Sequence, residues 1–403
     1  MRKIIWISPH LPYDNVAHAG GKIENYYIKR LSSASDIDLK LLSFYWDEEL
    51  KEFDLYNRVS CHLVPYHDKG FKKIQRNIKD LMFRYSPLDK YANVTTRYLK
   101  KNILSILSSL KKEGYFPDII VLQWTQIIVF TDEIKKIFPK SKIVSIEEDV
   151  TFLSYRRKYE HELNRYKKMF LKVNYKRLKE IEVNSLNKSD LIIVNNEKDK
   201  ALLLGENIQT KVRVWVPYFQ SFISKKRNPK HNNNIIFYGD MSRPENYLSA
   251  EWFVEKVLEK NVNLDVSFLI VGGRKPDKSL FEIKDKRVKV LGFVDDISDL
   301  LSNSLCLVAP LLLGAGIKIK ILEAMSAGLP VLTNEIGIEG IPAIDGEEFL
   351  FCKNPDDYLD NINKLVANTK LVQYLGDNSK IFINNKFNID GSFETFIEWL
   401  KSM

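Results

Sequence analysis

The residue types and spacing that most suggest chemistry lie in residues 314–330, which read GAGIKIKILEAMSAGLP. Gly314 and Gly316 carry no side chains, so backbone N–H groups there can approach an anion at the start of the helix predicted to follow. Lys318 and Lys320 add two cations to that helix start, where the helix dipole disfavours positive charge. A bound phosphate or diphosphate is the counter-charge that would explain them.

Glu323 lies one helical turn beyond Lys320, where a carboxylate can accept hydrogen bonds from vicinal hydroxyls such as those of a ribose. The pattern therefore suggests a nucleotide site. A surface helix with two solvated lysines and a Lys320–Glu323 ion pair is the alternative interpretation.

A second group of candidates is the acidic run Glu147, Glu148 and Asp149, directly after a predicted buried strand. Clustered carboxylates at a strand end can act as a base or bind sugar hydroxyls, and their crowding raises at least one pKa. A solvated turn followed by a helix start, where acids are favoured, is the alternative.

The elements that must position these residues are short, continuous apolar runs that alternate with helical patterns. Such runs are typical of parallel strands buried on both faces, and their alternation with helices indicates βαβ units. The predicted strands are Lys3–Ser8, Ile37–Phe44, Cys61–Pro65, Ile119–Gln123, Lys142–Ile146, Leu191–Asn195, Asn234–Gly239, Val266–Gly272, Val288–Gly292, Cys306–Pro310, Pro330–Thr333 and Phe349–Cys352.

These runs form two series, so we expect an α/β protein of two doubly wound parallel-sheet domains that face a central cleft. The predicted boundaries are 1–220, a linker at 221–234 that contains the polar stretch KKRNPKHNNN, and 235–390. Residues 391–403 read as an amphipathic helix with Ser392 as its N-cap. That helix either closes the second sheet or packs back on the first domain.

Composition narrows the class of protein. The 403 residues are 45% hydrophobic and 28% charged, as in an ordinary globular protein, and include only three cysteines. An odd number of widely spaced cysteines argues against a disulfide framework and favours a cytoplasmic protein. No apolar run approaches the roughly 20 residues that span a bilayer, so we do not expect a transmembrane segment.

Residues 314–331 also resemble the sugar-donor motif of GT-B glycosyltransferases of family 4, the retaining glycosyl transferases group 1 type. The matching pattern is Gly-x-Gly-x-Lys-x-Lys-Ile-Leu-Glu-Ala-Met-x-x-Gly-x-Pro-Val. Weaker resemblances occur in the family's order at His18–Ser32, Ser189–Lys200, Ile235–Phe253, Phe268–Gly273 and Val290–Asp296.

The resemblance implies the GT-B fold, with a nucleotide-diphosphate-sugar as substrate and with no cofactor and no metal. Lys318 and Lys320 would neutralise the diphosphate, with Lys320 catalytic through stabilisation of the leaving group, and Glu323 would hold the ribose. The remaining implied donor-binding positions are Gly20, Gly21, Gly239, Arg243, Gly272, Phe293, Val294, Gly314, Gly316 and Ile317.

The sequence departs from the family pattern at several positions. Ala315 stands where the family has the first of two glutamates, eight residues before Glu323. Asp240 and Asn246 occupy two positions that are commonly basic, and Arg243 nearby is the candidate substitute.

The predicted acceptor-binding domain also departs from the family pattern. Glu148 stands where many members place a histidine, so Glu148 and Asp149 are the catalytic candidates there. His10 and His18, in the first loop, are candidates for contacting the acceptor.

Positive charge is concentrated in the first half, where residues 1–220 hold 39 Lys and Arg against 27 Asp and Glu. Residues 71–101 and 156–179 hold nine and ten Lys and Arg, respectively, against two acids each, with aromatic residues between them. These stretches predict contact with an anionic membrane surface on its cytoplasmic face. Solvated helix faces are the alternative, and nucleic acid is disfavoured because no binding motif accompanies the charge.

The sequence therefore predicts a glycosyltransferase that moves a sugar to a glycan or lipid-linked acceptor, in bacterial surface-polysaccharide assembly such as that of capsule or O-antigen. Two alternatives stay open. One is a nucleotide-sugar epimerase on the same fold, and the other is a non-catalytic GT-B scaffold partner.

Overall fold

The computed structural model describes residues 1–14, 16, 19–54, 59–66, 91, 94–228, 232–273, 275–314 and 316–403. They divide into two compact units. The first unit is Met1–Tyr218 with Ile389–Met403, and the second unit is Phe219–Asn388. Among the helices of this described part of the chain, none is both long and apolar enough to span a membrane.

The first unit is built on a seven-stranded parallel sheet in the order β3-β2-β1-β4-β5-β6-β7. Along β1, Ile5 and Ile7 face one apolar core while Ile4 and Trp6 face another, so both faces of the sheet are covered. The strands are β1 (Arg2–Ser8), β2 (Ile37–Tyr45), β3 (Ser60–Pro65), β4 (Ile119–Gln123), β5 (Lys142–Glu147), β6 (Leu191–Val194) and β7 (Val212–Val214).

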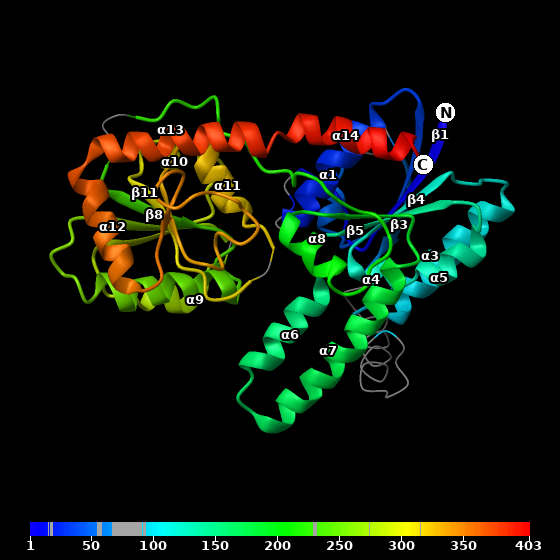
Figure 1. Ribbon diagram of the computed structural model, residues 1–403, viewed down its shortest axis with the longest axis horizontal. Coiled ribbons are helices and arrows are strands. Elements are labelled where there is room, and N and C mark those ends of the chain that lie inside the picture. Colours follow the sequence, from blue (N-terminus) through cyan, green and yellow to red (C-terminus); the bar gives the residue numbers. More distant parts are fainter. Residues whose placement is uncertain are drawn as a thin grey trace. The chain divides into compact units, whose positions relative to one another are not determined.

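Helices pack on both faces of this sheet (Figure 1). One face carries α3, α5 and part of α7, and the other carries α1 and α14. The helical segments are α1 (Ala19–Ser32), η1 (Glu49–Lys51), α3 (Arg97–Lys112), α4 (Thr125–Ile128), α5 (Thr131–Ile137), α6 (Thr151–His161), α7 (Arg165–Leu186), α8 (Glu197–Leu204) and α14 (Ile389–Lys401).

The C-terminal helix α14 packs on the first unit, where Phe393, Phe396 and Leu400 are buried in its core. Ser392 is not the N-cap that the sequence predicts, because the helix begins earlier, at Ile389. Its hydroxyl instead accepts a hydrogen bond from the backbone N–H of Val216 at 2.8 Å. This hydrogen bond therefore joins α14 to Val216, near the end of the Met1–Tyr218 segment of the first unit.

The second unit has a six-stranded parallel sheet in the order β10-β9-β8-β11-β12-β13. Its strands are β8 (Asn234–Tyr238), β9 (Ser267–Val271), β10 (Val288–Gly292), β11 (Cys306–Ala309), β12 (Val331–Thr333) and β13 (Leu350–Phe351). Its helical segments are α9 (Pro244–Phe253), the π-helical η2 (Val254–Leu258), η3 (Lys278–Glu282), α10 (Ser298–Asn303), α11 (Ile319–Ser326), α12 (Pro355–Ala367) and α13 (Thr369–Lys386).

The expected class, two Rossmann-like parallel-sheet α/β domains, is confirmed. Each of the twelve predicted apolar runs forms a strand whose ends agree to within two residues. The structure adds β7, whose three residues are too short to stand out as an apolar run.

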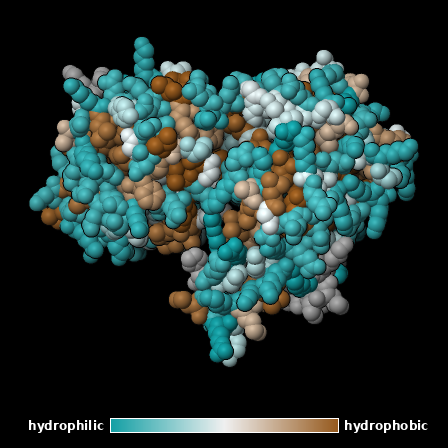
Figure 2. Space-filling view, viewed as in Figure 1, coloured by the Kyte–Doolittle hydropathy of each residue, from teal (hydrophilic) through white to brown (hydrophobic). Residues whose placement is uncertain are grey.

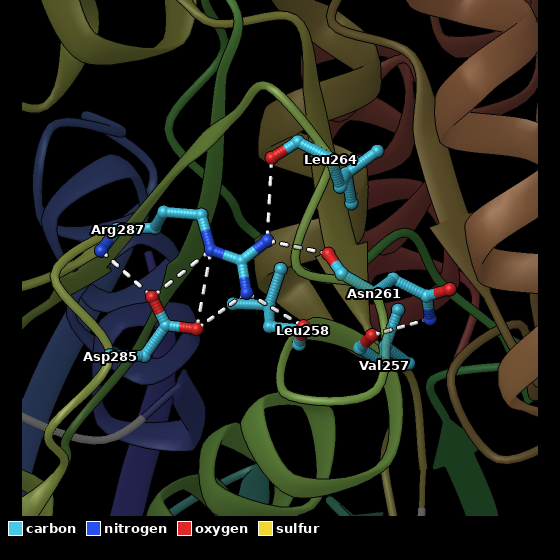
Figure 3. Close-up of polar contacts among 6 residues, drawn as sticks. All are labelled: Val257, Leu258, Asn261, Leu264, Asp285 and Arg287. Carbon is cyan, nitrogen blue, oxygen red and sulfur yellow. Dashed lines mark hydrogen bonds and ion pairs between the residues drawn. The ribbon is translucent and has the colours of Figure 1, made fainter.

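Arg287 stabilises the second unit by closing the turn between η2 and β9 (Figure 3). Its guanidinium donates to the carbonyl oxygens of Asn261 at 2.7 Å and Leu258 at 2.6 Å, and it pairs with Asp285 at 2.6 Å. Both carbonyls also accept a backbone N–H, that of Leu258 from Asn261 and that of Asn261 from Leu264, so Arg287 adds a second hydrogen bond to each.

Candidate functional site

Each sheet brings its own candidate residues to the edge where its parallel strands have their carboxyl ends. In each sheet, the chain continues from one central strand toward one side of the sheet and from the neighbouring central strand toward the other side. These neighbouring strands are β1 and β4 in the first unit and β8 and β11 in the second. Open parallel sheets bind ligands beyond the carboxyl ends of such strands. The predicted site residues that the structure describes follow the carboxyl end of a strand or lie in the first turn of the next helix, except Glu323, which lies in the middle of α11.

Lys320 is the centre of the site in the second unit. Its Nζ lies 2.7 Å from Asn246 Oδ1, at the start of α9, and 4.5 Å from the centre of the Phe237 ring. Burial, together with the neighbouring Lys318 charge, lowers the pKa of this ammonium to about 7. An anion at Nζ would reverse both effects, because it would supply the missing counter-charge.

Glu323 lies on the same helix, α11, and is held from β8. Its carboxylate accepts a hydrogen bond from the Tyr238 hydroxyl at 3.1 Å, and the same hydroxyl lies 2.7 Å from the Lys320 carbonyl oxygen. Burial raises the pKa of the Tyr238 hydroxyl well above its usual value, so this hydroxyl stays a hydrogen-bond donor. Tyr238 therefore orients the Glu323 side chain and fixes the main chain of α11 at Lys320.

Lys318 is the N-cap residue of α11 and turns toward the loop that precedes it. Its Nζ donates to the Gly316 carbonyl at 2.5 Å and lies 3.9 Å from the buried carboxylate of Glu339. The two lysines are thus held by different partners, one across to Asn246 and one within its own loop.

Glycines make room around Lys320. Gly239 has a φ of 155°, and a Cβ there would lie 2.8 Å from Lys320 Nζ. Gly272 has a φ of 109°, and a Cβ there would lie 2.1 Å from the Gly239 carbonyl oxygen. Gly314 and Gly316, with φ of 125° and 69°, also occupy the left-handed half of the backbone map, where a side chain is strained.

The other predicted donor-binding residues lie at the same edge of the second sheet. Phe293 is exposed and Val294 half-buried after β10, and Ile317 is half-buried before α11. Arg243 forms an ion pair with Glu245 at the start of α9. Asn246, a departure from the family pattern, is the residue that contacts Lys320 directly.

Glu148 is the centre of the site in the first unit. Its carboxylate accepts hydrogen bonds from Gln123 Nε2 at 2.5 Å and from Asn195 Nδ2 at 3.1 Å. Each amide is oriented in turn by an indole N–H, from Trp6 to Gln123 at 2.8 Å and from Trp215 to Asn195 at 2.6 Å. Both amides must therefore present their N–H groups to Glu148.

Burial raises the pKa of the Glu148 carboxyl to about 7, although the two amide hydrogen bonds lower it. A carboxyl that is half ionised near neutral pH suits a general base. Glu148 is buried, while Asp149 beside it is exposed. The structure thus separates two residues that the sequence presents as equivalent candidates.

Two further buried carboxyls lie at this edge. Glu24, on α1, accepts from Ser8 Oγ at 2.8 Å, and its other oxygen, Oε1, has no hydrogen-bond partner among the described residues. Burial raises its pKa well above the usual value, and the charge of Glu148 adds to that effect. Glu147 accepts from Thr125 Oγ1 at 2.7 Å, and burial also raises its pKa strongly.

Gly20 opens α1 against this cluster. A Cβ at Gly20 would lie 2.4 Å from the Trp124 ring and 3.4 Å from the Glu148 carboxyl carbon. Trp124 itself has a φ of 75°, an uncommon conformation for a bulky residue. Gly21 is buried beside Gly20, and the His10 ring contacts Trp124 edge-on at 5.2 Å.

Burial lowers the pKa of His10 to about 4, so its imidazole is neutral at physiological pH. His18 lies outside the described residues, as does Ala315. Among the residues that are described, no group of three or more His, Cys, Asp or Glu side chains could hold a metal ion.

The chain is similar to glycosyltransferases in sequence and in fold. Residues 232–368 match the family model "Glycosyl transferases group 1". This group 1 segment contains Lys318, Lys320 and Glu323, so the resemblance of the motif to glycosyl transferases group 1 is confirmed. An uncharacterized 44.6 kDa protein in the cps region of Klebsiella pneumoniae is 25% identical over 95% of this chain and 98% of its own length.

Solved structures agree on the fold. Sucrose-phosphate synthase from Thermosynechococcus elongatus has a TM-score of 0.70 at 14% identity, over 100% of this chain and 99% of that one. HepE of Anabaena, solved with UDP, has a TM-score of 0.67 at 13% identity over 100% of both chains. A glycosyltransferase from Rickettsia africae has a TM-score of 0.66 at 14% identity, over 100% of this chain and 98% of that one. The fold is GT-B.

Sequence reasoning missed the contacts that hold the candidate site residues in place. Tyr238 and Asn246 hold Glu323 and Lys320, and Gln123 and Asn195 hold Glu148. Gln123 and Asn195 end predicted strands, and a carboxamide at a strand's carboxyl end is the signal that could have identified them.

Proposed function

We propose that this protein is a glycosyltransferase that moves a sugar from a nucleotide-diphosphate-sugar to a glycan or lipid-linked acceptor. The observation that carries the proposal is the half-buried Lys320 ammonium, held by Asn246 beside Gly239 inside the group 1 segment. Because burial destabilises the charged form of this amine, a bound diphosphate would stabilise that form more than it would stabilise a solvated lysine. The proposed reaction retains the anomeric configuration and uses no metal.

In this proposal the second unit binds the sugar donor. Lys320 and Lys318 neutralise the diphosphate and then the leaving nucleoside diphosphate, and Glu323 holds the ribose. Gly239, Gly272, Gly314 and the backbone around Phe293 line the rest of the nucleotide site. UDP is the first nucleotide to test, because HepE was solved with UDP and with UDP-glucose.

The first unit engages the acceptor. Glu148 accepts a proton or a hydrogen bond from the acceptor hydroxyl, since its carboxyl titrates near neutral pH and is fixed on both oxygens. Gly20, Gly21 and His10 line this site, with Asp149 at its exposed margin. The relative in a cps region supports a role in bacterial surface-polysaccharide assembly.

The decisive experiment is a thermal-shift screen of the full chain against UDP, GDP, CMP and ADP and their sugar conjugates. A ligand at 100 times its Kd should stabilise the protein by about 2.7 kcal/mol. Lys320→Gln should reduce the shift by more than half, whereas the exposed Lys289→Gln, on β10, should leave it unchanged. If no nucleotide shifts the wild-type melting temperature, the result would favour a non-catalytic scaffold. Conversion of the donor sugar into another sugar without an acceptor would favour an epimerase.

A further inference from the structure

The helices α6 and α7 form a hairpin that projects from the first unit's sheet (Figure 1). Its base is fixed, because Glu182 on α7 accepts hydrogen bonds from the backbone N–H groups of Thr151 and Phe152 at 2.9 and 3.0 Å. The buried residues of α7 all lie at or beyond Asn174. The distal half, from Arg165 to Val173, contains no buried residue.

The distal half is nevertheless apolar on one side. Leu163, in the loop between the helices, is 97% exposed, and Tyr166 and Met169 are 83% and 67% exposed. Val173 is 51% exposed. Tyr166, Met169 and Val173 are spaced i, i+3 and i+7, so they form a stripe along one face of α7. Figure 2 shows hydrophobic residues at the surface of this hairpin among hydrophilic ones.

Cations surround the stripe. Residues 156–179 hold ten Lys and Arg against two acids, Glu160 and Glu162. Both acids are already paired, with Arg156 at 2.9 Å and with Lys167 at 2.7 Å. The surplus of positive charge therefore lies on an exposed surface that also carries the apolar stripe.

Three of these cations, Arg165, Lys172 and Lys176, form no ion pair with any described residue. Lys168, Lys172 and Lys176 are spaced i, i+4 and i+8, so they follow one flank of the stripe. Two copies of this hairpin would repel each other, because each would bring the same positive flank to the contact. A partner with negative charge at its surface and an apolar interior would complement both the lysines and the apolar stripe.

We propose that the distal end of the α6–α7 hairpin docks on an anionic membrane leaflet. Leu163, Tyr166, Met169 and Val173 enter the boundary between headgroups and acyl chains, and the lysines contact the anionic headgroups. Of the two basic stretches singled out in the sequence, most of the first, residues 71–90 and 92–93, lies outside the described residues, and the docking surface proposed here belongs to the second alone. This docking is independent of the proposed transferase activity.

The test is co-sedimentation of the full chain with phosphatidylcholine vesicles, with and without phosphatidylglycerol. The wild type should bind only the anionic vesicles, and added salt should weaken the binding. The double variant Leu163→Ser/Met169→Ser should bind at least tenfold more weakly. Phe116→Ser, which removes an apolar side chain 58% exposed elsewhere on the same unit, should bind like the wild type.

The charge is tested by Lys172→Gln/Lys176→Gln, which should lower the partition constant about thirtyfold, with each lysine near the surface contributing. Lys140→Gln, another exposed lysine of the first unit, is the control. Unchanged melting temperatures and nucleotide shifts would show that each variant is folded and that its donor site is intact.

Three results would overturn the proposal. They are absence of binding to anionic vesicles, equal binding to neutral vesicles, and wild-type binding by the Leu163→Ser/Met169→Ser variant. A concentration-dependent dimer that this variant abolishes, without vesicle binding by the wild type, would assign the stripe to self-association instead.

Discussion

Binding of a nucleoside diphosphate to the second unit should weaken as the pH rises above 7, because Lys320 must be protonated to attract the anion. Burial lowers the pKa of this ammonium to about 7 in the unliganded protein. A diphosphate at Nζ would raise that pKa, so the complex takes up a proton wherever the free amine is neutral.

The size of the change in Kd with pH follows from the pKa of Lys320. With a free pKa of about 7, the charged fraction is about one half at pH 7, about a tenth at pH 8 and about a hundredth at pH 9. Because the charged contact contributes about 2 kcal/mol, the neutral amine still binds the ligand, about thirtyfold more weakly. The Kd should therefore increase about fourfold from pH 7 to pH 8 and about twelvefold from pH 7 to pH 9. At pH 8, binding should take up about 0.7 proton per ligand.

Titration calorimetry of UDP at pH 8, in buffers that differ in ionisation enthalpy, measures this proton directly. The terminal phosphate, with a pKa of about 6, is already ionised at that pH and contributes little. Lys320→Gln should bind about 2 kcal/mol more weakly than the wild type at pH 6, take up no proton, and approach the wild-type Kd by pH 9. Lys289→Gln should match the wild type throughout.

Two results would refute the reasoning. The first is a wild-type Kd that does not change between pH 7 and pH 9. The second is the same proton uptake in the wild type and in Lys320→Gln, which would assign the titrating group elsewhere.

Three further predictions concern other parts of the molecule. Asn195→Ala should move the rise of transfer rate with pH to higher pH, because it removes a hydrogen bond that stabilises the ionised Glu148; an unchanged pH–rate profile would argue against Glu148 as the base. Gly272→Ala should unfold or markedly destabilise the second unit, since its Cβ would meet a backbone carbonyl at 2.1 Å, and a melting temperature within a degree or so of the wild type would contradict this packing. Arg287→Ala should destabilise the protein by about 2–4 kcal/mol in denaturant unfolding, because it removes charged hydrogen bonds to two carbonyls and the ion pair with Asp285, whereas the exposed Lys289→Ala should change the stability little.

The sequence by itself determined the fold class and the location of the candidate donor site. Continuous apolar runs such as Ile119–Gln123 and Cys306–Pro310 can be buried only in a sheet covered on both faces, so their positions predict a parallel α/β architecture. The motif at 314–330 is local, because glycines and lysines at a helix start act within a few residues. Its interpretation therefore needed no tertiary information.

Only the tertiary structure decided which groups meet those residues. Asn246 lies 74 residues from Lys320 in sequence, and Asn195 lies 47 from Glu148. Strand order brings each pair to one sheet edge, and no local pattern encodes that order.

The pKa values of about 7 at Lys320 and at Glu148 have the same origin. Each depends on how deeply the group is buried and on which distant side chains contact it. For this reason the sequence named Glu148 and Asp149 together, whereas the fold buries one carboxylate and leaves the other exposed.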